Sequence, residues 1–559
     1  MLPLSSFHID NLGETIKDVF LQRDNLDPFR LNAEISLLLA VWVHVRWMRN
    51  ANQRQFLRWF FLAFYFVALA YYLYEGVMLS LYQVEPVFYN HYLLLVDGLP
   101  FVGQHLKVPL GFYPVAAVIL GGGLWLIATL ARTMIDGISG ERLSRRSKLG
   151  LTLIALLVIA ATFKYQTTLA SPRMVISSLT CKLQQNIEDS IEAYRNILAL
   201  NNGAPRRPYN YSGYDLLEKP NIYLIFVESY GSVLYKRADY REAYTALLSQ
   251  LQRQLRESGW HAVSTLSEAP TWGGGSWMSY TSALFGTRID THPQFLSLLD
   301  KYQDIPYPDL GHYLKTQGYE YVRVSSLSDE LGEEEWLRYK KFYGVDRWLR
   351  YRDLGYHGAH FGWGPAPPDQ YVLNFAYETI IHTSEQPVFF FFITQNSHYP
   401  WVPLPEVVDD WRTLNQETAE EPVALPEPIL HEVRRSNYFK SIEYELRFLI
   451  DFIAEKGDDR SIFVLIGDHQ PQRVSRHNDG FETPVHIISR DRGLTDAFLE
   501  YGFVRGLAVH DIVPAMRHEG FYSMFVRALL ARYGQGLKPL PDYLPDGITL
   551  KDNASTNGS

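Results

Sequence analysis

The chain has 559 residues, of which 47% are hydrophobic and 14% aromatic, enough for a large core and more than one structural unit. Its 61 acidic residues outnumber its 52 basic ones, which argues against a nucleic-acid-binding protein that relies on a broad basic surface. A single cysteine, Cys181, excludes an intramolecular disulfide and a cysteine-rich zinc site.

The first third of the chain is rich in long apolar segments. Residues 1–30 are mixed and amphipathic, so we expect an interfacial segment rather than a signal peptide. Apolar segments close to the length that crosses a bilayer then follow at Leu31–Trp47, Phe56–Leu81, Tyr113–Ala131 and Leu149–Phe163. They predict a transmembrane domain over residues 31–166 with about four spans.

Loop charge predicts how these spans are oriented. Basic residues flank the first connection and fill the third, so both should be cytoplasmic. Everything after residue 166 then lies outside, which predicts a multi-pass protein of the cell membrane. Tyr92–Gly103 is also apolar, but counting it as a span would put one basic loop on the wrong side, so we interpret it as interfacial.

The rest of the chain has the pattern of an α/β domain. Residues 167–218 are predicted to be a polar, helical linker, and residues 536–559 a polar tail. Between them, over residues 219–535, short apolar runs alternate with amphipathic helical stretches. The runs are Asn221–Val227, Val388–Thr394 and Ser461–Ile466; the helical stretches include Tyr240–Ser258, Asp309–Gly318, Pro368–Thr383 and Asn437–Lys456. This pattern predicts a mostly parallel central sheet, with function at the carboxyl ends of its strands.

A glycine-rich segment, Pro270–Gly286 (PTWGGGSWMSYTSALFG), presents a candidate hydroxyl. Three glycines lead into Ser276 and a helix-compatible run, and a helix that begins there would point its unpaired N–H groups at a bound anion. Alone, such a segment is more often a plain flexible turn. The other candidate residues are therefore needed to distinguish a flexible turn from a site that presents Ser276 to an anion.

Metal-ligating residues follow two of the predicted strands. Glu228 comes directly after the first strand, and Asp468 and His469 come directly after the third. The second strand, Val388–Thr394, leads into Asn396–Pro400, which contains His398. Carboxylate and imidazole donors suit Zn²⁺ or Mn²⁺, with Mg²⁺ possible where water completes the shell.

These residues resemble a known family. VESYGS around Glu228, SWMSYTSALFG from Ser276, NSHYP around His398 and IGDHQP around Asp468 look like the sulfatase-like branch of the alkaline phosphatase superfamily. The resemblance is greatest to membrane-anchored lipoteichoic acid synthases and phosphoethanolamine or phosphoglycerol transferases. It implies that Glu228, Ser276, Asp468 and His469 hold one divalent metal, with Ser276 as nucleophile.

Departures from the sulfatase motif narrow the chemistry that the resemblance implies. Sulfatases convert their nucleophile to formylglycine, and the Pro and Arg that direct this conversion are Met278 and Tyr280 here. An unmodified serine points to phosphoryl-group chemistry. The transferases carry threonine at this position, so the substrate class stays open.

Further positions match the family's phosphate-binding residues. Trp336 and Arg338 resemble a Trp-x-Arg element that binds phosphoglycerol, and the guanidinium fork of an arginine suits phosphate oxygens. His477 resembles a histidine or arginine that helps hold phosphate, and His398 is expected to contact the transferred group.

The resulting hypothesis is a transferase that moves a phosphoglycerol- or phosphoethanolamine-type group from a phospholipid to an extracytoplasmic glycan or lipid. The group would pass through a covalent intermediate on Ser276. One rival is a hydrolase of the same fold, either a phosphodiesterase or a sulfatase. Another is a degenerate domain that only binds a glycan or partner. The sequence leaves open the acceptor, the head group, the metal, the oligomeric state and release of the domain by proteolysis.

Overall fold

The protein is described by a computed structural model that covers most of the chain in twelve stretches. They are residues 31–44, 51–105, 112–137, 143–164, 176–202, 209–302, 304–327, 332–361, 366–417, 431–509, 513–536 and 538–548. The predicted interfacial segment 1–30 lies outside the described residues. The chain divides into two compact units, Met1–Tyr194 and Arg195–Ser559, and the division falls inside helix α7 (Leu179–Asn202).

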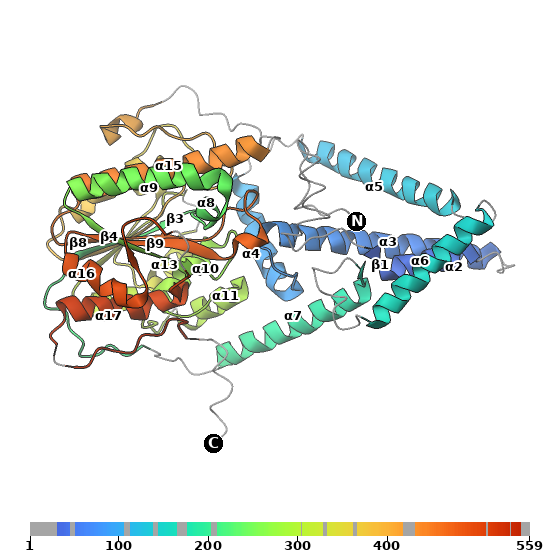
Figure 1. The fold of residues 1–559 in the computed structure, drawn as a ribbon, viewed down its shortest axis with the longest axis horizontal. Helices are drawn as coiled ribbons and strands as arrows, with labels where there is room; N and C mark the ends of the chain where they lie inside the picture. The colour runs from blue at the N-terminus through green and yellow to red at the C-terminus, as the bar shows by residue number, and fades with distance from the viewer. Residues whose placement is uncertain are drawn as a thin grey trace, which may run out of the picture. The chain divides into compact units, whose positions relative to one another are not determined.

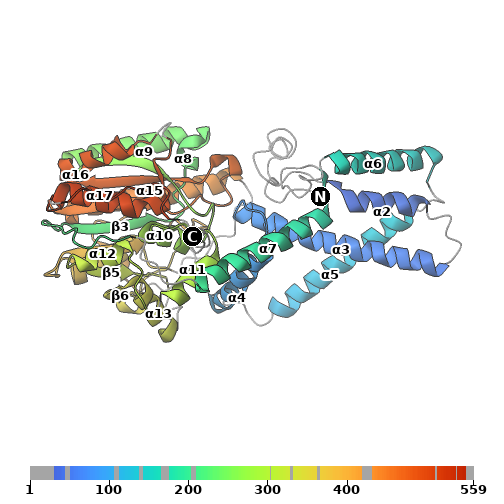
Figure 2. The same cartoon turned by 90° about the horizontal axis from the view of Figure 1, so that it is seen from below.

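The first unit is helical. Its helices are α2 (Ala33–His44), α3 (Ala51–Leu81), α4 (Phe88–His105), α5 (Phe112–Gly137), α6 (Arg145–Lys164) and the first part of α7. A short strand β1 (Leu31–Asn32) pairs in parallel with β2 (Ile176–Ser177). Helix α2 packs beside α6, and α3 packs against α2 and α5 (Figure 2).

Two helices of this unit are long and apolar enough to cross a membrane. They cover Asn52–Leu79 and Ala117–Gly137, and a shorter apolar helix covers Ala33–Val43. On α5, Val118 and Trp125 are 74% and 70% exposed, as expected of side chains that face lipid. In the described part of the chain, α2, α3, α5 and α6 each overlap one of the four predicted spans, and the count of four remains a prediction. The predicted interfacial piece Tyr92–Gly103 lies within α4.

The second unit is built on a nine-stranded sheet. The order is β10-β4-β9-β8-β3-β7-β5-β6, with β11 beside β4. The strands are β3 (Asn221–Val227), β4 (His261–Glu268), β5 (Glu320–Val324), β6 (Arg347–Leu349), β7 (Val388–Ile393), β8 (Ser461–Gly467), β9 (Glu482–Ser489), β10 (Val504–Arg505) and β11 (Met516–Arg517). The three predicted apolar runs are β3, β7 and β8, which lie side by side and parallel at the centre. Because they are buried on both faces, they are continuously apolar rather than alternating.

The sheet is mixed rather than parallel throughout. Strand β9 runs antiparallel to both of its neighbours, β8 and β4, and β10 runs antiparallel to β4. Alternation of strands with helices does not reveal this reversal, because β8 and β9 are joined by a connection with only a short 3-10 turn, without a crossover helix.

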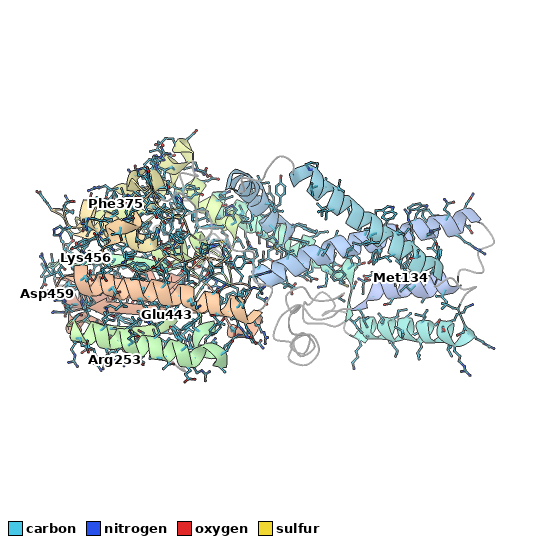
Figure 3. The ribbon with its side chains drawn as sticks, turned by 90° about the horizontal axis from the view of Figure 1, so that it is seen from above. Met134, Arg253, Phe375, Glu443, Lys456 and Asp459 are labelled. Carbon is cyan, nitrogen blue, oxygen red and sulfur yellow. The ribbon has the colours of Figure 1, made fainter. Side chains whose placement is uncertain are left out.

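Helices cover both faces of the sheet, with a hydrophobic core on each (Figure 1). One core involves α10 (Ser276–Phe285), α11 (His292–Lys301), α12 (Leu310–Thr316), α13 (Glu333–Tyr343), α16 (Arg492–Ala497) and α17 (Phe521–Tyr533). The other involves α8 (Val233–Lys236), α9 (Ala238–Glu257), α14 (Asp369–Ala376), which continues as a π-helical turn Tyr377–Ile381, and α15 (His431–Lys456). Helices α9 and α15 lie side by side in Figure 3.

Candidate metal centre and nucleophile

The register of the two central strands brings the predicted ligands together. Val227, the last residue of β3, pairs with Gly467, the last residue of β8. Glu228 and Asp468 therefore leave the sheet at the same edge. Gly467 lies under the loop after β3, because a Cβ there would be 2.0 Å from the carbonyl oxygen of Tyr230. A larger residue would push this loop, and Glu228 with it, away from Asp468.

Glu228, Asp468 and His469 form a buried cluster of possible metal ligands. Their ligand atoms all lie within 4.8 Å of one another. His469 Nε2 is 3.4 Å from Glu228 Oε1 and 3.3 Å from Asp468 Oδ2. The three residues are at most 2% exposed. Among the described residues this is the one group of three or more such side chains that could hold an ion.

The hydrogen bonds around the cluster leave Asp468 Oδ2 and His469 Nε2 available to bind a metal. Asp468 Oδ1 accepts backbone N–H groups of Ser229 and His469, both at 2.7 Å, whereas its buried Oδ2 accepts no hydrogen bond from the described residues. His469 Nδ1 lies 2.9 Å from the Gln470 carbonyl oxygen and must donate to it, so the lone pair is on Nε2.

Two buried carboxylates that face each other favour a bound proton or a bound cation. Burial and the charge of Glu228 raise the pKa of Asp468 to about 8 when no cation is present. Oxygen donors from Glu228 and Asp468 with a nitrogen donor from His469 fit a divalent metal such as Zn²⁺ or Mn²⁺. The residues present therefore match the predicted metal site.

Ser276 is the first residue of α10 and lies against this cluster. Its Oγ donates to Glu228 Oε2 at 2.9 Å and lies 3.3 Å from His469 Nε2. The helix starts here because Gly274 and Gly275 adopt positive φ angles of 67° and 74°, which turn the chain sharply into the helix. The unpaired N–H groups of the first helical turn, and the positive end of the dipole, are thereby brought to the metal-ligand cluster.

The other hydroxyls of this segment are committed elsewhere. Ser279 Oγ donates to the Asp468 carbonyl oxygen at 2.7 Å, and Thr281 Oγ1 lies 2.7 Å from Tyr343 Oη. Thr271 Oγ1 lies 3.3 Å from Ser279 Oγ. These three residues are buried, whereas Ser276 is half-buried and so accessible to a substrate.

His398 lies on the loop after β7, beside the cluster. Its Nδ1 is 2.7 Å from the carbonyl oxygen of Tyr399 and donates to it. Burial lowers its pKa, and the charges of His469 and Asp468 also act on it. At neutral pH the ring is therefore neutral, with its lone pair on Nε2.

The three remaining predicted substrate residues have no contact with the cluster among the described interactions. On α13, Trp336 is covered by the Arg350 guanidinium, 4.0 Å from the ring centroid, and Arg338 forms an ion pair with Asp300. His477 begins a short 3-10 helix, His477–Asp479, and is half-buried. Their binding roles remain predictions.

Sequence reasoning did not identify two buried groups near these elements. The Arg323 guanidinium on β5 lies 4.5–4.8 Å from the rings of Tyr280, Tyr343, Trp348 and Phe391. Asp369 at the start of α14 binds the loop that carries His398. Two sequence signals could have identified them: Arg323 is the one arginine in the strand EYVRV, and Asp369 stands at the start of an apolar helix.

The chain is similar to several solved structures. No protein-family model matches it, and no curated protein matches it. A lipoteichoic acid synthase from Listeria monocytogenes is 17% identical over 53% of this chain and 71% of that chain, with a TM-score of 0.35. The periplasmic domain of EcEptC from Escherichia coli, in complex with Zn, is 13% identical over 55% and 81%, with a TM-score of 0.37. A phosphoglycerol transferase from Streptococcus pyogenes is 14% identical over 65% and 88%, with a TM-score of 0.35. These include the kinds of protein that the sequence motifs resemble.

Proposed function

We propose that this chain is a membrane-anchored, metal-dependent transferase that acts through a covalent intermediate on Ser276. The observation that carries the proposal is the position of Ser276 Oγ, 2.9 Å from Glu228 and 3.3 Å from His469 at the start of α10. A half-buried hydroxyl at a helix N-terminus, beside three buried metal ligands, suits attack on an anionic ester.

One divalent cation would be held by Glu228, Asp468, His469 and Ser276 itself. When bound, it would lower the pKa of the serine hydroxyl and offset negative charge on the phosphoryl oxygens. Two atoms are best placed to bind it. Asp468 Oδ2 accepts no hydrogen bond from the described residues, and His469 Nε2 carries the lone pair of a ring that donates through Nδ1. Zn²⁺ and Mn²⁺ fit the mixed oxygen and nitrogen donors best, and Mg²⁺ is a third candidate.

The reaction proceeds in two displacements at phosphorus. Ser276 Oγ forms a bond to the phosphorus of a phospholipid head group, its proton leaves, and the bond from phosphorus to the diacylglycerol oxygen breaks. That oxygen takes up one proton, and diacylglycerol departs as a neutral alcohol. The oxygen of an acceptor hydroxyl then forms a bond to the phosphorus and loses its proton. The bond from phosphorus to Ser276 Oγ breaks, and that oxygen takes up one proton, which restores the serine hydroxyl.

Residues around the nucleophile would orient the group and manage these protons. The first N–H groups of α10 face the phosphate oxygens. His398, neutral at pH 7, can accept the proton of the acceptor hydroxyl at Nε2 and return it to Ser276. Trp336, Arg338 and His477 are assigned to the transferred group, as the motifs predict.

The apolar helices of the first unit support a lipid substrate. Helices Asn52–Leu79 and Ala117–Gly137 have the length and composition of membrane spans. We propose a multi-pass protein of the cell membrane with its catalytic unit outside. A phosphoglycerol- or phosphoethanolamine-type head group would pass to an extracytoplasmic glycan or lipid.

Mass spectrometry of the peptide that contains Ser276 tests the proposal. The full chain is incubated with phosphatidylglycerol or phosphatidylethanolamine vesicles and Mn²⁺ or Zn²⁺, then quenched in acid. We expect a phosphoglycerol or phosphoethanolamine adduct on Ser276, absent in Ser276→Ala and present in Ser279→Ala. Formylglycine at this position, or cleavage of aryl sulfates without any adduct, would show a sulfatase instead. An adduct that water discharges as fast as any added alcohol would show a phosphodiesterase.

A further inference from the structure

The loop that carries His398 is bound to the start of α14 by a reciprocal set of hydrogen bonds. Asp369 Oδ2 accepts the backbone N–H groups of Gln395 at 2.6 Å and Asn396 at 2.7 Å. Asn396 Oδ1 in turn accepts the backbone N–H of Asp369 at 2.7 Å. Both side chains are at most 1% exposed. Three short hydrogen bonds in a dry interior therefore fix the backbone two residues before His398.

The same loop is bound to a proposed metal ligand through its first residue, Thr394. The Glu228 backbone N–H donates to Thr394 Oγ1 at 3.0 Å, and Thr394 N–H donates to the Phe226 carbonyl oxygen at 3.0 Å. The path from Asp369 to His398 and Glu228 is thus short and built from buried hydrogen bonds. A change at Asp369 would displace His398 relative to Ser276 without removing a ligand.

A second carboxyl, Glu445 on α15, lies against Asp369 in the core. Glu445 is fully buried, and neither of its oxygens, nor Asp369 Oδ1, accepts a hydrogen bond from the described residues. Burial raises the pKa of Asp369 to about 6, and burial with the neighbouring charge of Asp369 raises the pKa of Glu445 further. Two adjacent carboxylates in such a site cannot both be ionised, and a proton between them gives Asp369 Oδ1 and one Glu445 oxygen a partner.

The two carboxyls have different surroundings, which decides where the charge lies. Asp369 Oδ2 accepts two backbone N–H groups, which favour its ionised form. Ser397 lies near Glu445 and also favours its ionised form, but burial and the charge of Asp369 act more strongly and raise the pKa of Glu445 well above its usual range. The proton therefore belongs to Glu445, and the negative charge to Asp369.

We propose that Asp369, Asn396 and Glu445 form a positioning unit for His398, in which ionised Asp369 holds the loop and protonated Glu445 donates to Asp369. The inference rests on the proposed function only in taking His398 to act on the transferred group. None of the three residues touches the substrate or the metal. They act through the backbone that places His398.

The asymmetry between the two carboxyls gives the test. Glu445→Gln keeps a neutral side chain that can donate to Asp369, so turnover should stay within about threefold of the wild type. Asp369→Ala removes the acceptor of both loop N–H groups, and should lower kcat on the order of 100-fold, the loss expected for a misplaced catalytic group. KM and bound metal should not change. Asn396→Ala, which removes one hydrogen bond, should fall between them.

A matched control separates positioning from loss of fold. Asp309 is also a buried aspartate at a helix start, where it accepts the His312 backbone N–H at 2.8 Å, and no described hydrogen bond joins it to the His398 loop. Asp309→Ala, which loses this acceptor, should lower thermal stability with kcat unchanged. Turnover of bis(para-nitrophenyl) phosphate by the full chain in detergent, with metal content measured on each variant, gives these values.

Hydrogen exchange of the loop gives a readout that does not need turnover. The Gln395 and Asn396 amides should lose protection in Asp369→Ala, which has no acceptor for them, and keep it in Glu445→Gln. Equal effects of the two substitutions on exchange, or unchanged protection in Asp369→Ala, would overturn the positioning unit. If the wild type turns over no phosphodiester, the proposed function fails. Hydrogen exchange of the Gln395 and Asn396 amides would still show whether the positioning unit exists.

Discussion

Ser276 Oγ lies 3.3 Å from His469 Nε2, so the proposed nucleophile is in contact with a proposed metal ligand. The two atoms come from α10 and from the end of β8, which are 193 residues apart in sequence. One cation bound there would contact both Ser276 Oγ and His469, which follows the carboxyl end of β8. Variants of the ligands and of the turn before Ser276 should therefore have separable effects.

Asp468→Asn should remove the metal without removing the fold. The asparagine oxygen can still accept the backbone N–H groups of Ser229 and His469, which bind Asp468 Oδ1 at 2.7 Å. What is lost is the charged Oδ2, so affinity for Zn²⁺ or Mn²⁺ should fall by at least about 100-fold. Calorimetry with each metal measures this. Ser229→Ala, which loses only a 3.1 Å hydrogen bond to Glu228, is the control and should lose much less. Equal affinities in Asp468→Asn and the wild type would place the metal elsewhere.

Gly275→Ala should lower both activity and stability. Gly275 has a φ of 74°, and an added Cβ would lie 2.5 Å from Met278 Cε. An L-residue in this region costs about 1–2 kcal/mol, and relief of the clash would move the start of α10. Gly332 also precedes a helix, but its φ is −54° and nothing lies within 4 Å of an added Cβ. Gly332→Ala should change the free energy of unfolding by less than about 0.5 kcal/mol. Similar losses in both variants would mean that the positive φ at Gly275 is not needed.

Arg323→Met should be tolerated far better than Arg323→Ala. The guanidinium is buried among four aromatic rings, and its Nε and Nη1 have no acceptor among the described residues. Methionine fills a similar volume and removes a charge that is costly to bury, so stability should change by less than about 1.5 kcal/mol. Alanine leaves a cavity and should cost roughly 3 kcal/mol or more. Thermal unfolding of the two variants gives the comparison. A loss in Arg323→Met as large as in Arg323→Ala would show that the cation–π contacts dominate.

Acid should destabilise the second unit through His486. The ring is fully buried between Ser264 Oγ at 2.7 Å and Tyr230 Oη at 2.9 Å, and burial lowers its pKa to about 3. The unfolded chain takes up a proton near pH 6.5, whereas the folded chain does not until about pH 3. The stabilisation is therefore complete above pH 6.5 and falls by about 1.4 kcal/mol for each pH unit below it.

A comparison with His486→Gln isolates this contribution. Buried carboxyls with raised pKa values, such as that of Asp369, change stability in the opposite direction, so the wild type alone would not reveal it. Between pH 7 and pH 5, unfolding by urea should show about 2 kcal/mol less loss in His486→Gln than in the wild type. An identical pH dependence in both would contradict a neutral buried imidazole.

Much of the site could be predicted from the sequence because its residues follow strands directly. β3, β7 and β8 are continuous apolar runs, so Glu228, His398 and Asp468 could be assigned to one edge of a sheet. Ser276 could be identified because the glycines before it are adjacent in sequence. The geometry confirms that Glu228, Ser276, Asp468 and His469 are brought together.

Other features depend on contacts that sequence spacing does not encode. The reversal of β9 follows from the connection it makes with β8, and hydropathy is the same for either direction. Asp369 and Glu445 come from α14 and α15, and their approach depends on how two helices pack on the sheet. Trp336 and Arg338 were predicted from a short motif. On α13 they contact Arg350, which follows β6, and Asp300 of α11, and their binding roles remain predictions.

The pairing of Val227 with Gly467 has a consequence for how the proposed metal site forms. A slip of one residue between β3 and β8 would turn either Glu228 or Asp468 to the opposite face of the sheet. Tight metal binding is then possible only for chains in which two strands distant in sequence have found the correct register. The amount of metal bound during refolding would therefore report the fraction of molecules in which β3 and β8 are correctly paired, because misregistered molecules would not retain the ion.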